Sequence, residues 1–182
     1  MCTIGLKDAA VMYNFYTGDS RGGFEKCYEK TFYEQNGIEF KLTETMLSYS
    51  NINVIRGLHF QIKKPQAKIV TVVSGAIIDI IVDLRVGSST FKKWEAIDLS
   101  MENHRSLYVP KGFAHGFASM ADNTAILYQC DGIYEKELDS GIRFDDVNLD
   151  IDWPISKEVA IHSSRDMKLN GFEDYMRNPF RV

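Results

Sequence analysis

The chain has 182 residues, of which 45% are hydrophobic, and a formal net charge of −4 at pH 7. This length suits one globular domain with its own core. The acidic balance argues against proteins that bind nucleic acids or membrane surfaces, because those partners favour a basic face. The sequence has no apolar stretch near the roughly 20 residues of a membrane-spanning helix and no signal-peptide pattern at its start. We therefore expect a cytoplasmic protein without a membrane or nucleic-acid partner.

The cysteines indicate the same compartment. Cys2, Cys27 and Cys130 are an odd number at irregular spacing, and no Cys-x-x-Cys pair occurs. Such a set is typical of free thiols in a reducing compartment, rather than of a disulfide framework or a zinc site.

The first fifty residues show only short local patterns. We predict a strand at Val11–Phe15, a turn at Asp19–Phe24, where glycines and charges gather, and a strand at Glu39–Ser50, where apolar residues alternate loosely. The helix-forming residues of 25–36 end at Gly37, which predicts a short helix with a glycine stop.

From Val54 onward, short apolar strands alternate with turns. The predicted strands are Ile69–Val73, Ala76–Leu84, Trp94–Leu99, Ser106–Val109, Gly116–Met120 and Ala125–Cys130. This spacing favours an antiparallel sandwich or barrel, with Gly75–Leu84, apolar on both faces, as a central strand. After Trp153-Pro154 the chain becomes polar and is expected to pack outside as short helices and coil. Without a repeat or linker, residues 1–182 are predicted to form a single all-β domain, with a core of about 19–154 and a C-terminal tail of 155–182.

Residues 56–61 read Arg-Gly-Leu-His-Phe-Gln and place charged groups in an apolar strand. Strand side chains alternate between faces, so we predict two sets: Arg56, Leu58 and Phe60 on one face, and Gly57, His59 and Gln61 on the other. Lys68 is the only cation in the β-branched run that follows. Cations are rarely placed at the mouth of a buried strand for packing. We therefore expect this segment to line a pocket for an anionic or carbonyl-bearing ligand.

Two of the four histidines stand out. His59 and His115 each lie in a glycine-bearing motif flanked by aromatic residues, where a histidine adds little to packing. His104 and His162 lie in polar surroundings and are expected to be structural. Sandwich folds of this type often bind a metal through a His-x-His pair, but residue 61 is Gln. Two imidazoles without a carboxylate partner in sequence make a poor divalent site, so no metal is expected.

Acid–base chemistry is the other class of function for these histidines. A histidine base needs a carboxylate that holds its tautomer and supports its cation. Five aspartates are candidates, and the sequence pattern alone does not choose among them: Asp79, Asp83, Asp145, Asp146 and Asp166. Tyr128 and Tyr134 are each expected in the core by default.

Seven motifs occur in a fixed order along the chain. They are Arg56 to Gln61; Lys68 with Gly75; Val82 to Trp94, in the pattern Val-Asp-Leu-Arg-x-x-Ser-x-Thr-x-x-x-Trp; Pro110 to Phe117; Tyr128 with Tyr134; Gly141 to Asp146; and Ile151 to Pro154. Together they resemble the dTDP-4-dehydrorhamnose 3,5-epimerase family, the RmlC-like cupins, over about Asp19 to Asp166. The resemblance implies a cupin jelly-roll β-sandwich with short peripheral helices and no metal or other cofactor. It also implies a homodimer in which residues 21–50 reach the neighbouring subunit.

The resemblance further implies roles for individual residues. His59 matches the family's catalytic base, Asp166 the carboxylate that pairs with it, and Tyr134 the acid on the opposite face of the sugar. Lys68 matches the residue near the 4-keto oxygen. Arg21 and Arg56 match residues that approach the diphosphate. The full set of positions that match substrate-binding residues is Arg21, Phe24, Lys26, Glu44, Arg56, Gln61, His115 and Arg143.

The implied activity is that of a cofactor-independent epimerase. It inverts C3, C5 or both in a 4-keto-6-deoxyhexose linked to a nucleoside diphosphate, in deoxysugar or surface-polysaccharide synthesis. Two departures from the family pattern bear on the nucleotide, because Lys26 replaces a glutamate and Glu44-x-Met46 replaces Gln-x-Asn. They leave open a CDP- or GDP-linked substrate in place of a dTDP-linked one, or inversion at one centre only. A metal-dependent cupin and a non-catalytic sugar-binding cupin are the alternatives from other classes.

Overall fold

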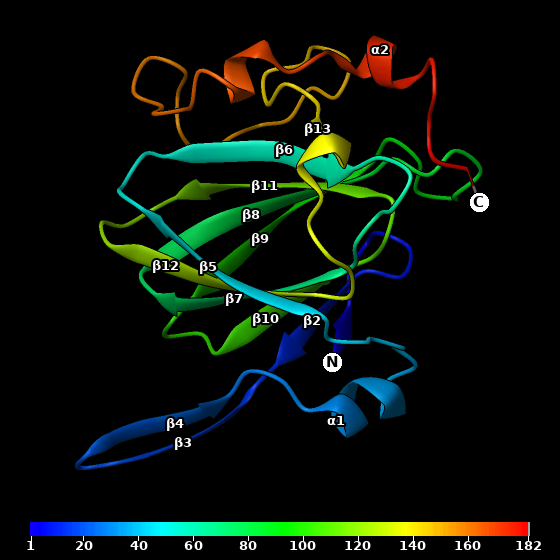
Figure 1. Cartoon of the computed structure of the whole chain (residues 1–182). Helices are drawn as coiled ribbons and strands as arrows, with labels where there is room; N and C mark the ends of the chain where they lie inside the picture. The colour runs from blue at the N-terminus through cyan, green and yellow to red at the C-terminus, as the bar shows by residue number, and fades with distance from the viewer. Residues whose placement is uncertain (182) are drawn as a thin grey trace.

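The computed structural model describes residues 1–181, which form two antiparallel sheets packed face to face (Figure 1). The first sheet has the order β1 (Cys2–Thr3), β2 (Ala10–Tyr13), β10 (Arg105–Val109), β7 (Lys68–Ser74), β12 (Thr124–Cys130) and β5 (Glu44–Ser50). The second has the order β13 (Asp139–Gly141), β6 (Ile55–Gln61), β11 (Phe113–Ser119), β8 (Ala76–Asp83) and β9 (Trp94–Ser100). The predicted all-β jelly-roll sandwich is confirmed.

The core is built by alternation along the strands. In β8, Ile77 and Ile81 belong to a buried cluster between the sheets, together with Val70 of β7. Ile80 and Val82, which point to the other side of the strand, belong to a second cluster on the outer face of the sheet. The strand is apolar on both faces because both faces are covered, as predicted for a central strand.

The outer face of the second sheet is covered by the C-terminal segment (Figure 1). A 3₁₀ turn, η1 (Lys136–Leu138), precedes β13, and the segment after β13 contains the 3₁₀ turn η2 (Asp166–Lys168) and the helix α2 (Phe172–Tyr175). Phe172 and Tyr175 are buried in the outer cluster, and the Tyr175 hydroxyl donates to the Leu84 carbonyl at 2.5 Å. The tail is therefore polar in sequence, yet a few apolar side chains anchor it over the sheet. Among residues 1–181, no helix has the length and apolar character needed to cross a membrane.

Residues 15–26 form a hairpin that extends away from the sandwich (Figure 1). Its strands are β3 (Phe15–Asp19) and β4 (Gly22–Lys26), and the helix α1 (Lys30–Gln35) follows. The predicted helix over 25–36 is therefore wrong in its first part, and the predicted turn shortens to residues 20–21. Glu25 pairs with Tyr16 in the hairpin, and its carboxylate accepts a hydrogen bond from the Asn14 amide at 2.7 Å. These contacts favour a strand over a helical turn.

Candidate active site

A cavity of about 350 Å³ opens between the two sheets. The first sheet lines it with Lys68 of β7 and Tyr128 of β12, and the second with Arg56 and His59 of β6 and His115 of β11. Cationic and acid–base side chains thus meet across one small space. This arrangement suits a ligand that carries negative charge and undergoes proton transfer.

His59 and His115 lie side by side because β6 and β11 pair at these two residues. The register of the two strands shifts between His115 and Phe117, whose partner is Arg56. Such an irregularity re-aims the side chains that follow it, and Arg56 lines the same cavity as His59. The prediction that these two residues lie on opposite faces is therefore wrong.

Two glycines allow β6 and β11 to approach closely at this point. Gly57 has a φ of +124°, and a Cβ atom there would lie 2.6 Å from Cα of Gly116 and 3.0 Å from the carbonyl oxygen of His115. Both contacts are with backbone, which cannot move aside like a flexible side chain, and the positive φ itself favours glycine. The glycine of the Arg-Gly-Leu-His motif thus brings the two histidines together.

Asp166 reaches His59 from the C-terminal tail. Its Oδ1 lies 2.8 Å from Nε2 of His59, and its Oδ2 lies 3.5 Å from the amide nitrogen of Gly57. Burial would raise the pKa of the Asp166 carboxyl, but His59, the Gly57 amide and the charge of Arg165 hold that pKa below its ordinary value. An ionised carboxylate beside an imidazole is what a histidine base requires. The structure thus places one of the five candidate aspartates, Asp166, at His59.

Arg165, which the sequence reasoning missed, lies beside the same ring nitrogen. Its Nη1 is 2.9 Å from Nε2 of His59, and its Nη2 donates to Oδ2 of Asp139 at 2.5 Å. A neutral or charged imidazole carries at most one hydrogen on each nitrogen. Nε2 therefore either donates to Asp166 or accepts from Arg165, and the two contacts exclude each other as hydrogen bonds. In the sequence, the one signal that Arg165 lies near His59 was its position next to Asp166.

Tyr134 lies at the rim of the cavity, with 44% of its surface exposed. Its hydroxyl donates to Oδ2 of Asp139 at 3.0 Å, and its amide donates to Oε2 of Glu44 at 2.9 Å. Partial burial and the Asp139 carboxylate raise the pKa of the Tyr134 phenol. Glu44, predicted as a substrate-binding residue, anchors the loop that carries Tyr134.

Gln61 also lines the cavity, but backbone groups occupy its amide. Its Oε1 accepts a hydrogen bond from the Glu135 amide at 2.6 Å, and its Nε2 donates to the carbonyls of Lys64 and Ile133, both at 3.2 Å. Both hydrogens of the side-chain amide are therefore engaged. The predicted substrate-binding residue Gln61 holds the loop at 133–135 in place.

Lys68 and Tyr128 face the two histidines from the opposite sheet. The Lys68 ammonium has no hydrogen-bond or ion-pair partner within residues 1–181, and burial lowers its pKa. The ring of half-buried Tyr128 lies edge-on to His115, with centroids 5.8 Å apart, and burial raises the pKa of its phenol well above the ordinary value. Tyr128 was expected in the core by default. Tyr128 lies two residues from Ile126 and from Cys130, so the three side chains share one face of β12, and this spacing was the available signal that Tyr128 points inward.

Besides Glu44, four predicted substrate-binding residues are absent from the lining of this cavity. Arg21, Phe24 and Lys26 belong to the hairpin, where the two cations form ion pairs at 2.6 Å with nearby acidic residues. Arg143 follows β13 and pairs with Asp145 at 2.8 Å. Within one chain, the structure does not bring these four residues to His59.

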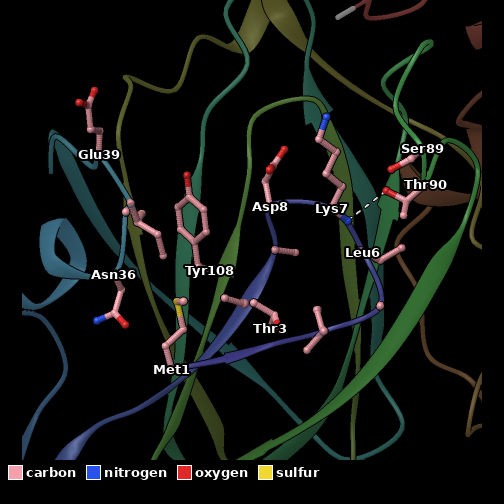
Figure 2. A pocket seen from close by; sticks show the side chains of 16 residues that line it. Met1, Thr3, Leu6, Lys7, Asp8, Asn36, Glu39, Ser89, Thr90 and Tyr108 are labelled. Atoms are coloured by element: carbon pink, nitrogen blue, oxygen red, sulfur yellow. Dashed lines mark hydrogen bonds between the residues drawn. The ribbon is translucent and has the colours of Figure 1, made fainter.

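A second hollow, of about 710 Å³, lies at the N-terminal segment (Figure 2). Asn36, Thr90 and Tyr108 contribute to its lining, and the Lys7 amide donates to the Thr90 hydroxyl at 3.1 Å. None of its lining residues is a histidine. The cavity of about 350 Å³ holds both His59, paired with Asp166, and the unpartnered ammonium of Lys68. We therefore identify this cavity as the candidate active site.

Comparison with known proteins identifies the family. A family model described as dTDP-4-dehydrorhamnose 3,5-epimerase matches residues 3–174. The dTDP-4-dehydrorhamnose 3,5-epimerase of Methanothermobacter thermautotrophicus is 43% identical over 137 residues, which are 75% of this chain and 74% of that protein. The enzyme of the same name from Shigella flexneri is 36% identical over 159 residues, which are 86% of this chain and 87% of that protein.

Solved structures agree with the sequence comparison. The dTDP-6-deoxy-D-glucose-3,5-epimerase of Legionella pneumophila, in complex with dTDP-4-keto-L-rhamnose, has a TM-score of 0.94 and 32% identity, covering 100% of this chain and 97% of that one. The dTDP-4-dehydrorhamnose 3,5-epimerase of Bacillus anthracis, with TDP and PPi bound, has a TM-score of 0.89 and 41% identity, covering 93% and 97% of the two chains. The chain therefore belongs to the dTDP-4-dehydrorhamnose 3,5-epimerase family.

Proposed function

We propose that the protein inverts the carbon centres beside the ketone of a dTDP-linked 4-keto-6-deoxyhexose. The proposal rests on the His59–Asp166 pair, 2.8 Å apart, which faces the unpartnered ammonium of Lys68 across a small cavity. The relatives support the substrate class, since the Legionella pneumophila structure holds a dTDP-linked keto sugar and the Bacillus anthracis structure holds TDP.

The reaction requires only proton transfers. A C–H bond next to a ketone is acidic because the charge left on carbon moves to the carbonyl oxygen. His59 takes the proton, and Lys68 stabilises the charged oxygen in a cavity where a charge counts for more than in water. A second proton, returned to the opposite face, restores the bond with inverted geometry. One proton leaves and one arrives, so the product is an isomer of the substrate.

Arg56 is the side chain best placed for the diphosphate. Its Nε donates to the Ser50 hydroxyl at 3.1 Å, and its Nη2 donates to the Tyr49 carbonyl at 3.0 Å. These bonds fix the guanidinium at the cavity wall and leave further N–H groups for phosphate oxygens.

Two tyrosines compete for the role of proton donor. The hydroxyl of Tyr134, which matches the family motif, is engaged with Asp139 at the rim. Tyr128 lies on the sheet opposite His59, and its hydroxyl has no hydrogen-bond partner within residues 1–181. In a solved structure of ChmJ, a 3'-monoepimerase of Streptomyces bikiniensis, a histidine and a tyrosine seventy positions apart are both replaced. In this chain, the spacing from His59 to Tyr128 is one position shorter than seventy, whereas the spacing from His59 to Tyr134 is five positions longer. These observations favour Tyr128, and the role of Tyr134 remains a prediction from the sequence.

The substrate is tested by proton NMR in heavy water with 4-keto-6-deoxyglucose linked to dTDP, CDP or GDP. We expect the dTDP-linked sugar to exchange fastest and to give inverted product. Faster turnover of the CDP- or GDP-linked sugar would connect the unusual Lys26 and Glu44 with a different base. Exchange at C3 or C5 alone would identify a single-centre epimerase. Absence of exchange with all three sugars would overturn the proposed function.

We also propose a homodimer. Large apolar side chains are exposed on the hairpin and on β5, where Phe15, Phe24, Leu47 and Tyr49 are 59, 60, 52 and 66% exposed. β5 is an edge strand of the first sheet, so one row of its backbone groups has no strand partner within residues 1–181. A second copy covers both surfaces if its hairpin lies along β5. Arg21 and Lys26 would then approach the cavity of the neighbouring subunit.

Light scattering at micromolar concentration is expected to give the mass of two chains. Tyr49→Glu places a charge on the exposed face of β5 and is expected to shift the protein to the monomer. Val147→Glu is the matched control, because Val147 is an exposed apolar residue, 86% accessible, outside the hairpin and β5. A monodisperse monomer formed by the unmodified chain would contradict the proposal.

The proposed setting is the cytoplasm, in deoxysugar synthesis for lipopolysaccharide or another surface polysaccharide. The three cysteines support it, because all are free and free thiols are typical of a reducing compartment. The substrate class supports it as well, since nucleotide-linked sugars are the activated form from which such polymers are assembled.

A further inference from the structure

A second carboxylate–imidazole pair lies at the wall of the cavity. Nε2 of His115 is 2.9 Å from Oδ2 of Asp79, which belongs to the adjacent strand β8 and pairs with Phe117. His115 is 5% exposed and Asp79 is completely buried. The pair is therefore closed off from bulk solvent, and His115 is exposed to the cavity, whose wall it forms in part.

Asp79 does not serve packing. Residues 77–82 are otherwise isoleucine and valine, and Oδ1 of Asp79 is buried without a hydrogen-bond partner within residues 1–181. Burial raises the pKa of its carboxyl, and the neighbouring His115 and Lys68 oppose that rise. A buried carboxylate with one unpaired oxygen lowers stability. Groups of this kind cluster at functional sites.

Asp83, on the same strand, shows a structural aspartate for comparison. Its carboxylate accepts hydrogen bonds from Arg85, Ser88 and Thr90 at 2.6 to 3.0 Å. Burial would raise its pKa, but these hydrogen bonds hold it below the ordinary value. Asp83 is thus saturated by its surroundings, whereas Asp79 has the imidazole alone.

The other side of His115 is available to a ligand. With Nε2 committed to Asp79, the second ring nitrogen, Nδ1, has no hydrogen-bond partner within residues 1–181. The ring lines the cavity together with Lys68, and Asp79 is one of the acidic groups whose charge acts on that lysine. One buried carboxylate therefore serves an imidazole and an ammonium on the same cavity.

We propose that Asp79 is a positioning residue that orients His115 and supports a positive charge on its ring, so that His115 and Lys68 both donate to the oxygen on which the enolate charge develops. This inference rests on the proposed function. Two cations in a cavity shielded from water repel each other, and the charge of Asp79 offsets one of them before the substrate oxygen becomes charged. His115 forms and breaks no covalent bond here; it only donates a hydrogen bond to the oxygen.

Asp79→Asn tests the proposal, because the amide oxygen can still accept from Nε2 while the charge is removed. We expect kcat, and the rate of deuterium exchange at C3 and C5, to fall about 10²-fold, as when one donor to a developing oxyanion is lost. KM should change by less than about threefold, since the diphosphate contacts persist. An unchanged kcat, with or without a rise in KM, would overturn the inference and leave Asp79 as a buried structural residue.

Asp83→Asn is the matched control, since it neutralises a second buried aspartate of β8 that does not line the cavity. We expect a lower melting temperature and an unchanged kcat for the folded enzyme. If Asp79→Asn does not fold, the double variant Asp79→Leu with His115→Phe replaces the pair by apolar groups. A folded double variant with reduced kcat supports the role of the pair, and full kcat overturns it.

The assay separates this inference from the proposed function. If the unmodified protein exchanges no proton in any of the three nucleotide-linked sugars, the proposed function fails. If the unmodified protein exchanges them and Asp79→Asn does so equally fast, only the role of Asp79 fails.

Discussion

His59→Ala is expected to abolish epimerisation and deuterium exchange at both C3 and C5. Removal of a general base typically costs about 10²–10⁴-fold, and one base can serve both centres if the sugar ring reorients. Proton NMR in heavy water measures this exchange directly, as the decrease of the proton signals at C3 and C5. Exchange that survives at one centre would mean that another group removes the proton there.

Asp166→Ala is expected to slow exchange strongly, because Nε2 of His59 then has only Arg165, at 2.9 Å. A cation at this position opposes the charge that the base acquires when it takes a proton. Asp145→Ala is the control, since the Asp145 carboxylate pairs with Arg143 and Lys157. Full exchange by the Asp166 variant would contradict the role of the pair.

The second large effect concerns Tyr128 and separates proton removal from proton return. Tyr128→Phe keeps the ring and removes the hydroxyl, while His59 and Lys68 still form and stabilise the enolate. We expect deuterium to enter the substrate by return from the same face, and inverted product to fall about 10²-fold or more. The NMR experiment measures exchange and inversion in the same sample.

Tyr134→Phe is the matched variant, because it removes the hydroxyl that donates to Asp139. If Tyr128 is the donor, Tyr134→Phe should retain most of the inversion. Exchange without inversion in Tyr134→Phe, together with normal inversion in Tyr128→Phe, would support the assignment from the sequence and refute ours. Equal loss of exchange and inversion in either variant would mean that its hydroxyl positions the sugar.

The sandwich was predictable because its strands carry their own signals. Apart from Asp79 and Asp83, β8 is apolar on both faces; it pairs with β11 on one side and β9 on the other, and the turns around it contain the expected small and polar residues. The hairpin at 15–26 was not predictable, because both of its faces are exposed and no buried face imposes alternation. Glu25 therefore counted as a helix former, although it pairs with Tyr16 in the hairpin.

The site was predictable where one motif holds the residue and unpredictable where two segments must meet. His59 and Lys68 stand out as polar groups in apolar strands. The side to which Arg56 points depends on a shift of register between β6 and β11. The residue pattern of β6 alone does not predict this shift. The choice of Asp166 depends on the docking of the tail, which joins residues far apart in the chain.

The carboxylate that completes the base lies on the C-terminal tail, which Phe172 and Tyr175 fix over the second sheet. The last strand of the sandwich ends at Gly141, so both sheets can be synthesised before Asp166 leaves the ribosome. The strands that line the cavity are therefore synthesised before the carboxylate that pairs with His59. In the folded protein, local detachment of the tail would separate Asp166 from His59 and uncover the apolar outer face of the second sheet.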